Sequence, residues 1–221
     1  MRLNVFVLSF ALLLVGCSEE NNTEPVDQLI PTVLDKAPEV KQHPVEQQKN
    51  EKAELASFFP PDGSTAYFQG EGNEFASFTL QTSYIDANYI AQMEDNGAVT
   101  ILKVYRITDL AIELIYKEAV NTKPILPTAQ EAASFPVIET ILQKPLKAGN
   151  SFNGWTIQST TASTTTGITV YRDVIKLTRS EGSMTTTKYF VKNIGLIRTE
   201  DTMKTNNKEP FVITSTLQKI E

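Results

Sequence analysis

The sequence is poor in the residues that most catalytic and metal sites need. Among 221 residues it has one cysteine, Cys17, and one histidine, His43, and both precede the part that we expect to fold. A Ser-His-Asp triad, a Cys-His pair or a Cys/His zinc site therefore has no histidine or cysteine available there. An internal disulfide is excluded because it needs two cysteines. We expect no catalytic residues of these classes, no metal site and no cofactor, and we predict that the protein is not an enzyme.

The sequence also lacks nucleotide-binding motifs, long apolar runs and an excess of basic charge. It contains neither a P-loop nor a dinucleotide-binding fingerprint. Its longest apolar run, residues 6–15, is too short for a membrane-spanning helix, which needs roughly 20 residues. The formal net charge is −6, and most of it falls on residues 18–54, so the rest of the chain carries no basic stripe. Because binding to nucleic acid depends on Lys and Arg beside phosphates, we expect no nucleic-acid partner.

The N-terminus has the three-part pattern of a secretory signal. Arg2 supplies positive charge, residues 6–15 are apolar except for Ser9, and Gly16 places a small residue before Cys17. We therefore predict a signal peptide over residues 1–16, with cleavage between Gly16 and Cys17. The cysteine after the cleavage site either belongs to the signal, as in lipoproteins, or follows an ordinary signal peptide by chance.

The end of this signal resembles the lipobox of bacterial lipoproteins. That pattern is an aliphatic residue, a small or aliphatic residue, Gly or Ala, and then Cys, and Leu14-Val15-Gly16-Cys17 matches it at every position. The resemblance implies a diacylglycerol joined to the sulfur of Cys17 through a thioether, which makes the membrane a partner. Two acyl chains anchor a protein stably, because each buried CH₂ contributes about 0.8 kcal/mol. We expect the mature protein on the outer face of the plasma membrane.

Residues 17–54 are expected to be the lipidated cysteine followed by a disordered tether. The stretch is rich in Glu, Gln, Asn and Lys, and its few apolar residues bury too little surface to offset the entropy of ordering. A flexible chain of about 35 residues spans on the order of 30–35 Å. Any helix would be interrupted by four prolines, which are Pro25, Pro31, Pro38 and Pro44.

Residues 55–221 are expected to form one β-rich domain. Period-2 alternation marks residues 75–82, where Ala76, Phe78 and Leu80 fall on one face, and later segments are rich in β-branched residues. A one-faced sheet must cover its apolar side. The predicted fold is mainly β, an antiparallel meander curled into a half-barrel, a barrel or a sandwich, with at most one or two short helices. Strands are predicted at 66–69, 75–82, 84–93, 99–107, 110–116, 152–158, 170–178, 184–191, 196–199 and 211–217.

Three local patterns add detail to this domain. Asn96-Gly97 lies between two apolar runs and predicts a hairpin with a type I′ turn, in which both central residues have positive φ. Thr128 is expected to cap a short helix through Ser134, with Glu131 at the third position. Residues 137–142 are read as a strand or a helical turn, and the Ser/Thr run at 159–166 as a solvated loop or an exposed strand.

The order of features along the domain resembles that of a lipoprotein family. The features are residues 67–74 (YFQGEGNE), Asn96-Gly97, residues 145–149 (PLKAG) and residues 189–197 (YFVKNIGLI). They are similar to those of a family of uncharacterised lipoproteins of Gram-positive, Bacillus-like bacteria, over about residues 58–220. The resemblance implies a lipobox signal followed by a single β-rich domain. It carries over no activity and no site residue.

Aromatic residues are the candidates for a binding groove. Tyr67, Phe68 and Trp155 are the predicted groove residues, and core packing is the competing interpretation because aromatic side chains commonly fill β cores. Glu71 and Glu74 flank a glycine-rich turn and could hold a hard cation or act as acid and base. A solvated acidic turn is the favoured reading of that pair.

Three hypotheses for function follow from these observations. The leading one is a lipid-anchored extracytoplasmic protein whose β domain has a non-catalytic binding or structural role, with an envelope protein, a glycan or a lipid as partner. The first alternative is a carrier of an apolar ligand or lipid in a β half-barrel. The second alternative is a hydrolase of wall glycans that uses Glu71, Glu74 or another carboxylate.

Overall fold

The computed structural model describes residues 52–120, 124–205 and 209–221. The predicted signal peptide, the cleavage and lipidation site at Gly16-Cys17, the residue His43 and the predicted tether as far as residue 51 lie outside these ranges. Within them, no helix has both the length and the hydropathy that crossing a membrane requires.

The described chain begins with a short helix that spans the predicted boundary at residue 55. Residues 52–56 are helical, and the carboxylate of Glu54 pairs with Lys144 at 3.2 Å and with Lys192 at 3.0 Å. These ion pairs join the helix to the segments that follow β6 (Glu139–Gln143) and β10 (Met184–Val191).

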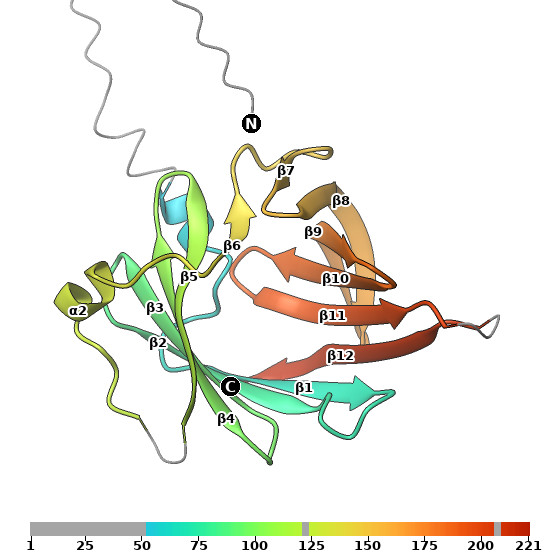
Figure 1. The fold of residues 1–221 in the computed structure, drawn as a ribbon, viewed down its shortest axis with the longest axis horizontal. Helices are drawn as coiled ribbons and strands as arrows, with labels where there is room; N and C mark the ends of the chain where they lie inside the picture. The colour runs from blue at the N-terminus through green and yellow to red at the C-terminus, as the bar shows by residue number, and fades with distance from the viewer. Residues whose placement is uncertain (1–51, 121–123, 206–208) are drawn as a thin grey trace, which may run out of the picture. The chain divides into compact units, whose positions relative to one another are not determined.

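The described residues form twelve strands in one antiparallel sheet (Figure 1). The bounds are β1 (Thr65–Glu71), β2 (Phe78–Tyr84), β3 (Tyr89–Asp95), β4 (Thr100–Ile107), β5 (Ala111–Val120), β6 (Glu139–Gln143), β7 (Ser151–Phe152), β8 (Trp155–Thr166), β9 (Thr169–Glu181), β10 (Met184–Val191), β11 (Gly195–Met203) and β12 (Phe211–Ile220).

The order across the sheet is β6-β5-β4-β3-β2-β1-β12-β11-β10-β9-β8-β7. Strands that follow each other in sequence are neighbours, except β6 and β7, as short antiparallel connections favour. The one further pairing joins the first strand to the last, because β1 runs antiparallel to β12. That pairing places β1 and β12 in the middle of the sheet. The edges are β6 and β7, which residues 144–150 connect.

The sheet curls until its two edges approach each other, so that it forms a nearly closed barrel (Figure 1). Among the described residues no backbone ladder joins β6 to β7 or β8, and we call this gap the seam. Side chains bridge the seam. The amide of Asn150 donates a 3.0 Å hydrogen bond to the carbonyl of Gln143, and the amide of Asn153 donates a 3.1 Å bond to the hydroxyl of Thr140.

The residues before β1 fill part of the barrel interior, and we call residues 52–60 the N-terminal plug. Leu55 and Phe58 are buried, and the ring of Phe59 lies 5.2 Å from that of Tyr105 on β4. The same hydrophobic cluster includes Phe190 on β10, so the plug contacts both halves of the sheet. Burial of each such side chain stabilises the fold by about 1.5–3 kcal/mol.

The predicted fold class is confirmed, and the barrel is the form that the sheet takes. The described helices are residues 52–56 and α2 (Ala129–Ala133). The predicted capping box is also present, since Thr128 accepts a hydrogen bond from the Glu131 amide and the Glu131 side chain accepts one from the Thr128 amide. Ala132 is buried and packs α2 against apolar side chains of β4 and β5.

The structure decides two open alternatives in favour of strands, and it contradicts two other local predictions. Residues 139–143 form strand β6, and the Ser/Thr run belongs to β8. The hairpin at Asn96-Gly97 exists, but only Gly97 has positive φ, so the type I′ turn is wrong. The Asn96 side chain instead accepts hydrogen bonds from the Ala98 and Val99 amides within a four-residue loop. The strand predicted at 84–93 is divided by a turn, because the Asp86 carboxylate binds two backbone amides there.

Candidate functional site

The barrel contains a cavity of about 380 Å³ between its two halves. Ligand sites in proteins commonly enclose about 300–1,000 Å³. Part of the lining is apolar and includes Phe58 and Phe59 from the plug and Phe190 from β10. The walls also carry hydroxyl, amide, carboxylate and ammonium groups. The cavity therefore suits a molecule that is apolar at one part and polar at another.

One wall takes its character from alternation along β10. Thr186, Lys188 and Phe190 all line the cavity, because every second residue of a strand faces the same side. In the register with β11, Thr186 lies opposite Asp201 and Lys188 lies opposite Thr199, and both partners line the cavity as well. The wall thus changes along the strand from hydroxyl and carboxylate groups, through an ammonium group, to an aromatic ring.

The other half of the sheet supplies polar groups from β3 and β4. Glu94 and Lys103 form an ion pair at 2.5 Å, with side-chain exposures of 27% and 17%. Gln92 is buried and donates a 3.1 Å hydrogen bond to the hydroxyl of Thr82. Buried polar groups are costly unless they are hydrogen-bonded, and these groups have partners within the same wall.

A cluster of charged groups surrounds the buried side chain of Trp155 at the seam. Its Nε1 donates a 2.9 Å hydrogen bond to Oε1 of Glu139, and the guanidinium of Arg179 donates a 2.7 Å bond to the same oxygen. The Arg179 guanidinium carbon lies 4.6 Å from the indole centroid, and Nζ of Lys188 lies 4.7 Å from it. Both distances are within the range of cation–π attraction. One indole therefore contacts two cations and one carboxylate.

Burial and neighbouring charges shift the pKa of two groups in this cluster. Burial alone would raise the pKa of Glu139, but the hydrogen bond from Trp155 and the charges of Lys188 and Arg179 together lower it below the ordinary value of 4.5. Burial lowers the pKa of Lys188 below the ordinary value of 10.5, and the negative charge of Glu139 offsets only part of this effect. The cluster therefore favours an ionised Glu139 and disfavours the charge on Lys188.

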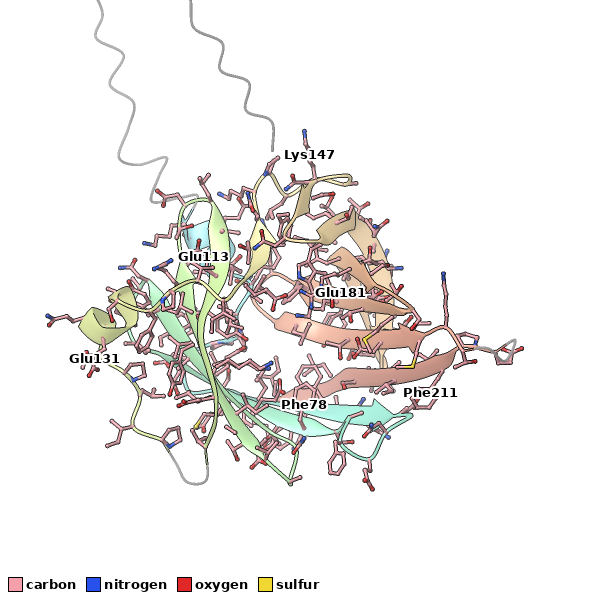
Figure 2. All side chains as sticks on the ribbon, in the orientation of Figure 1. Phe78, Glu113, Glu131, Lys147, Glu181 and Phe211 are labelled. Atoms are coloured by element: carbon pink, nitrogen blue, oxygen red, sulfur yellow. The ribbon has the colours of Figure 1, made fainter. Side chains whose placement is uncertain are left out.

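The three residues predicted to form a groove lie in different surroundings. Tyr67 packs under Lys219, whose Nζ is 4.4 Å from the ring centroid, whereas the buried ring of Phe68 stacks on Phe78 at 4.4 Å. Trp155 lies at the seam. Of the described aromatic residues, those that line the cavity are Phe58, Phe59, Phe75, Phe78, Tyr105 and Phe190. In Figure 2, Phe78 is seen beside β1.

The predicted acidic pair lies at the surface. Glu71 ends β1, Glu74 follows in the next loop, and both side chains are exposed. Across the described ranges there is no group of three or more His, Cys, Asp or Glu side chains placed to hold a metal ion. The pair is next to Asn73 and Phe75, which line the cavity, so it lies near the rim of the cavity and not in its walls.

Sequence reasoning missed the charged residues of the site. Lys188 falls on the same strand face as Phe190, so one side of β10 is both charged and aromatic. The opposite side carries Thr187 and Tyr189, so alternation alone does not show which side faces inward. A lysine that shares a face with an aromatic residue is the signal that the sequence offers. The same reasoning applies to Lys103, which shares a face with Tyr105.

No family model matches this chain, and no curated protein matches its sequence. Among solved structures, the chain is similar to a protein from Bacteroides fragilis that is described as an exported protein with a YmcC-like fold. The TM-score is 0.44 and the sequence identity is 13%, and the match covers 74% of this chain and 98% of that one.

Proposed function

We propose that this protein is a lipid-anchored, extracytoplasmic binding protein whose barrel holds a small ligand and catalyses no reaction. The observation that carries this proposal is the cavity of about 380 Å³, which has an apolar part and charged walls. A barrel with a purely structural role would fill its interior, because protein cores pack to a density of about 0.74. An unfilled interior with several polar groups favours binding.

The N-terminal segment supports the proposed location. Leu14-Val15-Gly16-Cys17 has the lipobox pattern at the end of an export signal, and the resulting lipid would hold the domain at the outer face of the plasma membrane. Membership in the lipoprotein family of Bacillus-like bacteria is part of the same proposal. The partner on this reading is a component of the cell envelope.

Labelling with radioactive palmitate in a lipoprotein-making bacterium tests the anchor. We expect the wild-type chain to incorporate label and the Cys17→Ala variant to incorporate none. Mass spectrometry of the mature N-terminal peptide should show a diacylglyceryl group on Cys17. An unmodified thiol at this position, or an N-terminus elsewhere, contradicts the anchor and leaves the cavity unaffected.

Native mass spectrometry tests the binding function. The full chain with Cys17→Ser, which cannot accept the lipid, should co-purify with a small-molecule adduct. The variant Thr199→Trp places an indole in the cavity and should lose the adduct, whereas Thr214→Trp, on the neighbouring strand and outside the cavity lining, should keep it. Adduct levels that are equal in both variants, or no adduct in the parent chain, contradict a ligand in the barrel.

A carrier of a wholly apolar ligand is the second candidate function. The observation in its favour is the cluster of rings from Phe58, Phe59 and Phe190 in the lining. Such a carrier would bind an uncharged hydrocarbon chain at least as tightly as a charged one. The charged groups on the walls favour the first proposal, because desolvating them against hydrocarbon would cost free energy.

A further inference from the structure

Within the described part of the chain, Lys188 is a charged cavity residue that forms neither an ion pair nor a hydrogen bond. It lines the cavity from β10, its side chain is partly buried, and this burial lowers its pKa. Among the described residues, no carboxylate oxygen lies within 4.0 Å of its Nζ, and no acceptor forms a hydrogen bond with it. An ammonium group has three N–H donors, and a ligand with an anionic oxygen at this position would accept from them.

The acidic side chains of the cavity lining and of the neighbouring seam have partners of their own. Glu139 accepts from Trp155 and Arg179, and Glu94 is paired with Lys103 at 2.5 Å. Asp201 accepts a 2.6 Å hydrogen bond from the hydroxyl of Thr186 and remains farther than 4.0 Å from Nζ of Lys188. Of these acids, Glu139 and Asp201 act on the charge of Lys188 from a distance. They do not supply acceptors to the ammonium group.

Lys188 contacts the indole ring of Trp155, and this contact does not use the N–H donors of the ammonium group. Nζ lies 4.7 Å from the Trp155 centroid, a contact that stabilises a cation without accepting a directed hydrogen bond. The indole N–H of Trp155 donates its hydrogen bond to Glu139. Because Lys188 lines the cavity, its remaining donors are available to whatever occupies that space.

The residues along the wall place an apolar region beside this ammonium group. Phe190 is two residues farther along β10 on the same face, and the plug contributes Phe58 and Phe59 to the same lining. In the other direction the wall carries Thr186 and Asp201. A ligand that reaches Lys188 with one end therefore has rings available for an apolar chain.

From this geometry we infer that the cavity binds an amphiphile with a single anionic group, whose anion pairs with Lys188 and whose hydrocarbon part contacts Phe58, Phe59 and Phe190. The inference rests on the proposed function, because it specifies the ligand of the same cavity. A cationic ligand would meet an unpaired ammonium group and carboxylates that already have partners. A neutral ligand would leave the donors of Lys188 without a charged acceptor.

Decanoate and 1-decanol are the matched probes, because they share a chain length and differ in charge at pH 7.5. The full chain with Cys17→Ser is titrated with each probe, and the fluorescence of Trp155, which is the only tryptophan in the chain, reports binding beside Lys188. Calorimetry provides an independent affinity. We expect decanoate to bind at least tenfold more tightly than 1-decanol.

Substitution of Lys188 tests which group makes the difference. Lys188→Gln removes the charge and should weaken decanoate binding at least tenfold, or about 1.4 kcal/mol, while the affinity for 1-decanol stays within about twofold. Lys188→Arg keeps the charge and should retain most of the affinity for decanoate. Lys147→Gln, on the exposed turn before β7 (Figure 2), is the matched control and should change neither affinity.

The outcomes separate this inference from the proposed function. If 1-decanol binds as tightly as decanoate, or if Lys188→Gln leaves decanoate binding unchanged, the cavity is a ligand site but the anion inference is overturned. If neither probe binds and native mass spectrometry finds no adduct, both proposals fail. If Lys188→Gln does not fold, the ratio of affinities in the parent chain and the result with Lys188→Arg decide the inference.

Discussion

Nε1 of Trp155 donates a 2.9 Å hydrogen bond to Oε1 of Glu139, and this bond crosses the seam between β8 and β6. The bond matters because no backbone ladder joins these strands within the described residues. Arg179 donates to the same carboxylate oxygen from β9. At this position one acidic side chain on β6 thus accepts hydrogen bonds from both β8 and β9, with the Asn153–Thr140 bond alongside it.

We predict that Glu139→Ala lowers the free energy of unfolding by about 1–3 kcal/mol. The substitution leaves the indole N–H of a buried tryptophan without an acceptor and removes an ion-pair partner of Arg179. Urea denaturation measures the change. Glu181→Ala is the matched control, since Glu181 also pairs with Arg179 but its side chain is 72% exposed, and it should cost less than about 0.5 kcal/mol. If the two variants lose the same free energy of unfolding, the hydrogen bonds of Glu139 across the seam do not stabilise the barrel as predicted.

Stability should decline at acidic pH because the carboxylates of Glu139 and Glu54 have lowered pKa values in the folded state. For Glu54 the hydrogen bond from Lys192 is the main cause, and for Glu139 the bond from Trp155 and nearby cations outweigh burial. A lowered folded-state pKa contributes stability above the unfolded value of about 4.5, and this contribution is lost as pH falls through the folded value.

Urea midpoints at pH 6.5, 4.5 and 3.5 check the pH prediction. The urea midpoint of the wild type should change little between pH 6.5 and 4.5. It should decrease more steeply between pH 4.5 and 3.5. Glu139→Gln should be less stable at pH 6.5 and should lose less on acidification, and adding Glu54→Gln should flatten the profile further. A loss on acidification in Glu139→Gln as large as in wild type would argue against this carboxylate as a contributor.

Gly70→Ala should disturb the rim of the cavity. A Cβ at this position would lie 2.2 Å from the backbone carbon of Ala76, so the loop before β2 must move. Overpacking of this kind typically costs about 1–3 kcal/mol. Because Asn73 and Phe75 belong to that loop and line the cavity, decanoate binding should weaken as well.

Gly182→Ala is the control for Gly70→Ala. Gly182 has a φ of 59°, and a Cβ on this residue would meet no atom within 4 Å other than those of its chain neighbours. The cost is therefore the backbone strain alone, about 1–2 kcal/mol. Ligand affinity should not change in this variant. Thermal unfolding and a decanoate titration of both variants separate a loss of stability from a loss of binding.

Phe58→Ala should be the most damaging single change in the plug. Its side chain is 2% exposed and contacts residues from both halves of the barrel, so truncation leaves a void and should cost about 3–5 kcal/mol. Phe75→Ala makes the same substitution at a side chain that is 51% exposed, and should cost less than about 1.5 kcal/mol. Chemical denaturation measures the free energy of unfolding of both variants. A larger loss for Phe75→Ala than for Phe58→Ala would contradict the prediction that the N-terminal plug is part of the core.

Local patterns predicted much of the fold but little of the site. The capping box at Thr128 and Glu131 is readable because its partners are three residues apart. The division of residues 84–93 into two strands was missed because the carboxylate of Asp86 turns the chain where apolar residues continue on both sides. The groove prediction chose aromatic residues by type, and type does not show that Tyr67 packs under Lys219 while Phe190 lines the cavity.

The amino-acid sequence by itself determined the mainly β character of the domain, the positions of most strands and the pattern of the export signal, since alternation, turn residues and short motifs act between neighbours in the chain. Only the tertiary structure decided that β1 pairs with β12, that Glu139 meets Trp155 at the seam, and that Lys188 lies over that indole inside a cavity. These relationships join residues far apart in sequence. They arise from the curling of the sheet, which no local pattern encodes.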